Sequence, residues 1–155
     1  MPAFLAGLAE ATGQPIEVEA LLPPLEADIA METFRTGYQS ATQPGIGNYR
    51  RFFRSSERDT VFDLAVCLAG QLSREAVLFL TKLGADSCAV NLEASVLLTH
   101  AASVIRFDGD SLSALSVDRT QGILIDHNPD DLEQTYEIAA WGDRWSPLVL
   151  YCDQE

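Results

Sequence analysis

The six-residue stretch DHNPDD, which starts at Asp126, places three carboxylates, an imidazole and a carboxamide side by side. These groups are metal ligands and general acid–base groups. Asp126, Asn128 and Asp130 stand at positions 1, 3 and 5 of a calcium-loop pattern, and Glu137 stands at position 12. The pattern needs Gly at position 6, where this chain has another Asp, so we predict no EF-hand here.

An enzymatic alternative uses the same stretch. His127 would act as the base, with Asp126 and Asp130 as its carboxylate partners or as ligands of a metal. The second histidine, His100, has no ligand-spaced partner near it, and no nucleophile or nucleotide-binding motif occurs in the chain. We therefore predict no cofactor and no metal, and keep the acid–base or metal-dependent enzyme as the alternative hypothesis.

A structural interpretation of the stretch is a helix start. Asn128 is a preferred N-cap residue, and Pro129 suits the first helical position because its φ is preset and it has no N–H to satisfy. Asp130, Asp131 and Glu133 would then lie in the first turn, where the helix dipole favours anions. The sequence NPDDLEQ thus predicts one or two helical turns with a negative face.

Net charge is the strongest global property of this 155-residue chain. The formal net charge is −13, and residues 108–155 alone hold eleven acids and two bases. A field of this sign repels nucleic acid and anionic lipid, and it speeds the encounter with a basic protein. We therefore expect no nucleic-acid partner and no membrane partner.

The acidic C-terminal third also contains aromatic residues, which serve as anchors in protein interfaces. We predict a non-enzymatic binding protein that neutralises a basic protein partner by charge and steric occlusion, as an immunity protein or an inhibitor does. An assembly or scaffold role is the remaining alternative. The predicted partner-binding residues are Asp126, Asp130, Asp131, Glu133, Glu137, Trp141, Asp143 and Trp145.

A second cluster, YRRFFRSSER at residues 49–58, holds four of the ten basic residues, interleaved with aromatics. Arginine beside aromatic side chains can grip phosphates or bases, but the charge of the whole chain opposes such ligands. We predict that these arginines pair with the acidic ends, either within one chain or across a homodimer, or that they anchor an interface.

The positions of the apolar residues and turn formers predict the secondary structure. Residues 39–48 form the clearest loop, and Gly142 and Asp143 suit a hairpin turn. We predict one domain over residues 1–155, of the α+β class, with a mainly antiparallel sheet and two or three helices packed on one face. The expected helices are 3–11, 25–38 and 73–83; the expected strands are 16–20, 60–70 (or a helix), 87–99, 102–110, 121–127 and the two arms of a hairpin over 135–151.

The cysteines and the hydropathy pattern indicate the compartment. Cys67, Cys88 and Cys152 are an odd, widely spaced set without a CxxC motif, which favours free, buried thiols in a reducing cytosol. No apolar run is long enough to span a membrane, and the N-terminus lacks the basic residues of a signal peptide. We expect a cytoplasmic protein.

Overall fold

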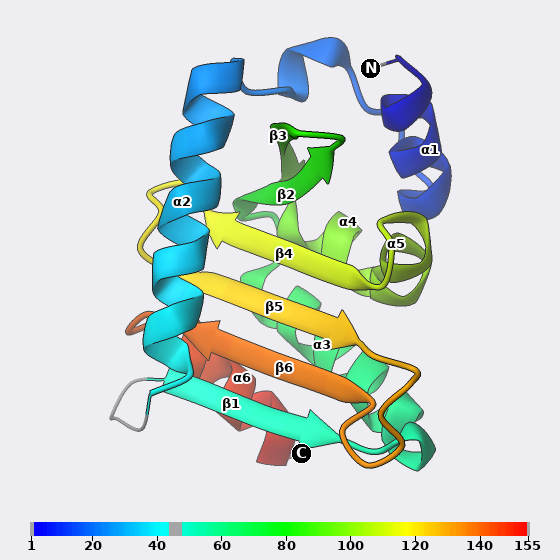
Figure 1. Ribbon diagram of the computed structural model, residues 1–155, viewed down its shortest axis with the longest axis vertical. Helices are drawn as coiled ribbons and strands as arrows, with labels where there is room; N and C mark the ends of the chain where they lie inside the picture. The colour runs from blue at the N-terminus through cyan, green and yellow to red at the C-terminus, as the bar shows by residue number, and fades with distance from the viewer. Residues whose placement is uncertain (1, 44–47, 155) are drawn as a thin grey trace.

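A computed structural model describes residues 2–43 and 48–154 of the chain and has one antiparallel sheet at its centre (Figure 1). Six strands pair in the order β1-β6-β5-β4-β2-β3, and every neighbouring pair is antiparallel. The strands are β1 Asn48–Phe53, β2 Ala76–Leu83, β3 Asp86–Glu93, β4 Ser111–Ser116, β5 Gly122–His127 and β6 Tyr136–Trp141.

Helices cover both faces of the sheet. One long helix, α2, crosses the front face in Figure 1, and the other helices pack on the back face or beside it. The predicted α+β class and antiparallel sheet are confirmed, but the number and placement of the helices were wrong. The described residues form α1 Pro2–Thr12, α2 Pro24–Ala41, α3 Arg58–Leu72, α4 Ala94–Thr99, α5 Ala101–Phe107 and α6 Trp145–Gln154, with short 3₁₀ turns at Val18–Ala20 and Ser55–Glu57.

The two faces of the sheet supply two hydrophobic cores. Successive strand residues point to opposite faces, so Val77 and Phe79 of β2 pack against the helices on the back face, whereas Leu78 and Leu80 pack under α2. All four side chains are buried. Full burial of such a side chain stabilises the fold by roughly 1.5–3 kcal/mol.

Burial on both faces explains why residues 76–83 of the predicted helix 73–83 form a strand instead. The run AVLFLTKL has no polar position until Thr81, as is typical of a strand covered on both sides. Periodicity cannot separate such a strand from a buried helix. Gly84, the residue after the predicted helix, follows β2 with φ +65° in the turn before β3.

The predicted strands 102–110 and 16–20 were wrong, and for residues 60–70 the helix that we had kept as the alternative is correct. Residues 60–70 lie in α3, residues 102–107 lie in α5, and residues 18–20 form a 3₁₀ turn. Within 87–99, β3 ends at Glu93 and a helix follows. In α3 the buried residues Val61, Leu64, Ala65 and Leu68 follow helical spacing, which the short alternation of Val61, Asp63 and Ala65 had concealed.

The predicted C-terminal hairpin is half correct. Its first arm is strand β6, but the residues after Gly142 form helix α6. Pro147 lies in the first turn of this helix, where a missing N–H costs no hydrogen bond. The predicted helices 3–11 and 25–38 and the predicted strand 121–127 are confirmed.

Helix α2 ends later than predicted. It extends to Ala41 and so includes residues 39–41 of the predicted 39–48 loop, of which 44–47 lie outside the described residues. Pro24 opens the helix, and the small buried residues Ala27 and Ala30 bring its backbone close to the sheet. Among the described residues, no helix has the length and apolar character that crossing a bilayer requires.

A disulfide joins α3 to α6. Cys67 and Cys152 are bonded, with their Cα atoms 5.8 Å apart and a sequence separation of 85. The expectation of three free thiols was therefore wrong, and only Cys88 is a free, buried thiol. No local motif signalled the bond, because two distant helices bring its halves together.

Candidate functional site

The acidic stretch after β5 is a loop, not the predicted helix start. Asn128 Oδ1 accepts a hydrogen bond from the Asp130 backbone N–H, and Asp131 Oδ1 accepts from the N–H groups of Glu133 and Gln134. Asp and Asn side chains that bond nearby backbone in this way compete with helix formation. The loop, residues 128–135, is closed by a backbone bond from Asn128 N–H to the Thr135 carbonyl.

The residues of the enzymatic alternative do not converge. Asp126 and His127 are neighbours on strand β5, so their side chains project to opposite faces of the sheet. His127 stacks on Tyr136 and lies 3.5 Å from an Asp110 carboxylate oxygen. In the described part of the chain, no group of three or more acidic, histidine or cysteine side chains is placed to hold a metal.

Glu137 is occupied by partners within the chain. Its buried carboxylate accepts hydrogen bonds from the Tyr38 hydroxyl of α2 and from Arg50 Nε of β1, at 2.9 and 2.8 Å. The Glu137 hydrogen bond raises the pKa of Arg50, and burial followed by Glu137 raises the pKa of Tyr38. Asp126 faces Glu137 across the strand pair; burial, and then the charge of Glu137, raise its pKa.

The basic cluster at residues 49–58 pairs mostly within the chain. Arg50 bonds Glu137, and Arg51 bonds Asp153 of α6 and Glu57. Arg50 and Arg51 also lie over the rings of Phe52 and Phe53, at 4.7 and 4.4 Å from the ring centres. The predicted pairing with the acidic C-terminal part is thus confirmed within one chain for Arg50 and Arg51.

Both tryptophans of the predicted partner-binding set are in the core. Trp145 is fully buried, and Trp141 packs under α2 with its ring edge-on to Phe34 at 5.0 Å. Neither ring is placed as a surface anchor. The remaining predicted residues on the surface are the loop acids Asp130, Asp131 and Glu133, with Asp143 at the turn before α6 and half-buried Asp126.

An apolar side chain that we did not predict lies among the loop acids. Leu132 is 78% exposed, more than any other large hydrophobic residue that the structure describes. Asp130, Asp131 and Glu133 flank it, and none of the three has an ion-pair partner within the described ranges. We call residues 130–133 the acidic loop tip.

The outer face of α2 is a second exposed surface of mixed character. Leu25 and Ile29 are 71% and 53% exposed and lie one turn apart. Asp28 and Glu32 share this face, and Glu32 contacts Arg35 in an exposed pair. The apolar and acidic side chains therefore also alternate here, but on a rigid helix.

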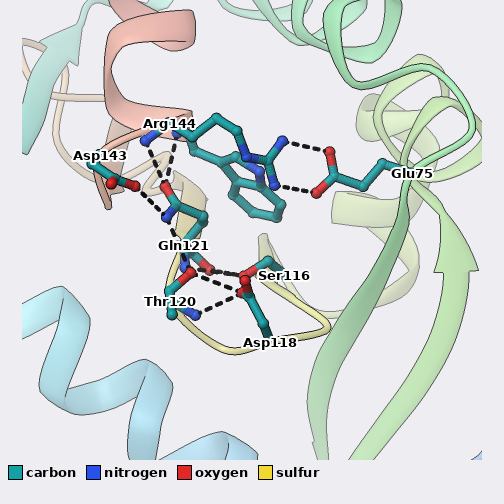
Figure 2. Close-up of polar contacts among 8 residues, drawn as sticks. Glu75, Ser116, Asp118, Thr120, Gln121, Asp143 and Arg144 are labelled. Atoms are coloured by element: carbon teal, nitrogen blue, oxygen red, sulfur yellow. Dashed lines mark hydrogen bonds and ion pairs between the residues drawn. The ribbon is translucent and has the colours of Figure 1, made fainter.

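A polar network fixes the β4–β5 loop against the start of α6 (Figure 2). Buried Gln121 is its centre: Oε1 accepts from the backbone N–H groups of Arg144 and Trp145, and Nε2 donates to Thr120 and Asp143. The Arg144 guanidinium makes two hydrogen bonds to the Glu75 carboxylate just before β2.

Asp118 holds the tip of the same loop. One of its carboxylate oxygens accepts from the Ser116 hydroxyl and from the N–H and hydroxyl of Thr120 (Figure 2). These bonds, that of Ser116 first, lower the pKa of Asp118 to about 2. Arg119 lies between Asp118 and Thr120, and its φ of +66° is in the left-handed region that favours Gly.

Arg119 lines a pocket between this loop and α2. The pocket has a volume of about 350 Å³ and is bounded by Glu32, Thr33, Thr36, Gly37, Arg119 and Trp141. The Nε atom of Arg119 is buried and has no hydrogen-bond partner among the residues that the structure describes. No pattern in the sequence marked Arg119 as a candidate binding residue, because the residues around its side chain come from α2 and β6.

A second polar pocket lies where β2 and β4 separate. Their pairing ends at Leu80 and Ser113, and the Asp108 carboxylate accepts a hydrogen bond from the Thr81 hydroxyl beyond that point. Burial raises the pKa of Asp108 to about 6. The pocket of about 310 Å³ is also lined by Lys82 and Ser111.

Comparison of the chain with protein-family models, with curated proteins and with solved structures gives no match in any of the three. Its function must therefore be inferred from the geometry and chemistry of these surfaces.

Proposed function

We propose that the chain is a non-enzymatic binding protein that takes a basic protein partner on the acidic loop tip. The observation that carries the proposal is Leu132, which is 78% exposed and is flanked by carboxylates that have no ion-pair partner among the described residues. An apolar centre surrounded by a polar rim is the usual arrangement of a protein interface. The carboxylates would attract lysine and arginine, and Leu132 would supply apolar contact.

The loop geometry supports this function because it reduces the entropy cost of binding. Asn128 Oδ1 and Asp131 Oδ1 accept hydrogen bonds from backbone N–H groups, and the Thr135 hydroxyl donates one to the Asp131 carbonyl; together these bonds stabilise the backbone of residues 128–135. A preorganised loop orders fewer groups when a partner docks, which leaves more of the contact energy as affinity.

The net charge of −13 supports the same partner class at longer range. It raises the association rate with a cationic surface and makes that rate sensitive to salt. The immunity-protein or inhibitor role then requires that the loop tip cover a functional cleft of the partner.

The experiment starts with a photo-crosslinking residue in place of Leu132, which labels whatever contacts the loop tip in cells. The captured protein is then purified and its association with the unmodified chain is measured at several salt concentrations. We expect a basic protein whose association rate falls as salt rises. A captured protein of acidic or neutral charge, or binding insensitive to salt, would contradict the proposal.

Two double variants with the same change in net charge distinguish the effect of the loop tip on the association rate from the effect of total charge. Asp130→Lys with Glu133→Lys should lower the association rate about tenfold or more. Asp28→Lys with Glu32→Lys on α2 changes the net charge equally and should lower the rate much less. Equal effects of the two double variants would place the contact elsewhere.

A further inference from the structure

The pocket beside Arg119 offers hydrogen-bond donors that the fold does not use. Arg119 makes no side-chain hydrogen bond or ion pair within the described residues, and its Nε is buried without an acceptor. The indole N–H of Trp141 has no acceptor in the described part of the chain. Leaving a buried donor such as Arg119 Nε without an acceptor costs about 1–3 kcal/mol.

The backbone at Arg119 carries a second cost. A φ of +66° is natural for Gly or Asn in a hairpin loop and unfavourable for arginine. The contacts of Asp118 with Ser116 and Thr120 nevertheless hold the loop in this conformation. Within the described residues, Arg119 therefore combines a strained backbone conformation with a guanidinium that makes no hydrogen bond or ion pair.

We propose that this pocket binds a carboxylate group carried on a small apolar body, with Arg119 as the anion-binding residue. The planar guanidinium matches a carboxylate in geometry and forms charge-assisted hydrogen bonds with it. The Trp141 ring supplies an apolar wall, and the methyl groups of Thr33 and Thr36 add to it. The volume of about 350 Å³ suits a ligand of roughly ten non-hydrogen atoms.

The charges around the pocket select a monoanion over a phosphate. Glu32 stands on the rim, and the whole chain is strongly negative. A doubly charged ligand would meet more repulsion than a singly charged one while gaining only one cationic partner. The carboxylate could be carried by a free organic acid or by the C-terminus of a polypeptide.

Benzoate is a suitable probe, with benzamide as its neutral isostere. The chain has two tryptophans, so its ¹⁵N spectrum contains two indole N–H signals, which a Trp141→Phe variant assigns. We expect benzoate to shift the Trp141 signal saturably, with a dissociation constant on the order of 1 mM, and to leave the signal of fully buried Trp145 in place. Benzamide should cause no saturable shift.

Arg119→Gly is the decisive variant, because the backbone conformation at this position favours Gly and the fold is retained. It should weaken benzoate binding about tenfold or more. Arg106→Gln, which removes an exposed arginine of α5 that does not line the pocket, should leave the binding unchanged. Equal shifts with benzamide, undiminished binding to Arg119→Gly, tighter binding of inorganic phosphate, or no saturable shift with benzoate would each overturn the proposal.

Two further titrations distinguish the sources of the carboxylate. A short peptide ending in leucine is compared with the same peptide amidated at its C-terminus. Tighter binding of the free-acid peptide than of benzoate assigns the pocket to a polypeptide end. Binding of benzoate without binding of the peptide assigns it to a free organic acid, and either result supports the carboxylate site.

Discussion

Gln121 on the loop before β5 accepts, through one side-chain oxygen, a hydrogen bond of 2.9 Å from the backbone N–H of Trp145 at the start of α6. The same oxygen accepts from Arg144 N–H, so a residue 24 positions earlier caps the helix. Gln121 is only 4% exposed, and its amide nitrogen is also bonded. It therefore joins the β4–β5 loop to α6 by direct hydrogen bonds.

Replacing this residue should destabilise the fold strongly. Gln121→Ala leaves two helix N–H groups without an acceptor, and we expect the free energy of unfolding to fall by about 2–3 kcal/mol. Urea denaturation measures this, with Gln134→Ala on the exposed 128–135 loop as the control, for which we expect a change under about 0.5 kcal/mol. A loss of free energy no larger than that of Gln134→Ala would show that water can accept hydrogen bonds from the N–H groups at the start of α6.

The Cys67–Cys152 disulfide should make stability depend on reductant. It closes a loop of 85 residues, and a bond of that span contributes about 2–5 kcal/mol by restricting the unfolded chain. We expect the melting temperature of the unmodified protein to fall when dithiothreitol is added. Cys88→Ala keeps the disulfide and should show the same fall.

The double variant Cys67→Ala with Cys152→Ala supplies the contrast for that measurement. It should melt at a lower temperature than the parent and show no response to reductant. A response that follows Cys88 instead would assign the effect to the buried free thiol.

Elements with one clear pattern were predictable from the sequence, and elements buried on both sides were not. Strand β5 has Ile123 and Ile125 alternating toward one core, and α2 opens with proline and repeats small apolar residues at helical spacing. The same reasoning failed for strand β2, because Leu78, Phe79 and Leu80 are all buried, on alternate faces. Which faces a strand buries depends on elements far away in the sequence.

The candidate sites divide in the same way. The acids of the 128–135 loop could be identified from the sequence because they lie close together. Leu132 between them could have been identified as an apolar residue in a polar run. Local side-chain bonds from Asn128 and Asp131 favoured a loop over the helix that Pro129 suggested. Arg119 could be identified as a candidate binding residue only from its contacts with α2 and Trp141, which no local sequence pattern connects to it.

Asp108 should give the stability a characteristic pH dependence. Burial raises its pKa from 3.8 to about 6 in the folded state, so the folded protein binds the proton more tightly than the unfolded chain does. The stabilisation from this proton is complete below about pH 4 and is lost as the pH rises through about 6. At neutral pH the charged carboxylate therefore weakens the fold.

Asp108→Asn removes this titration and keeps an oxygen that can accept from the Thr81 hydroxyl. We expect the variant to gain free energy of unfolding over the parent by about 1–2 kcal/mol between about pH 4 and neutrality, after allowance for solvent screening. Urea denaturation at a series of pH values measures the gain, and Asp59→Asn on the exposed face of α3 corrects for net charge. A difference independent of pH would contradict the buried-carboxylate explanation.

Two helical glycines should respond oppositely to the same substitution. Alanine favours a helix over glycine by about 1 kcal/mol, so Gly70→Ala in α3, where a new Cβ meets no atom within 4 Å, should raise the free energy of unfolding by about 0.5–1 kcal/mol.

A Cβ on Gly37 of α2 would lie 2.1 Å from Trp141 Nε1. The buried ring cannot move without separating α2 from the sheet, and such overpacking costs about 1–3 kcal/mol. We therefore expect Gly37→Ala to lower the free energy of unfolding, as measured by urea denaturation of both variants beside the parent. Stabilisation by both alanines would mean that the α2–sheet contact is loose enough to admit a methyl group.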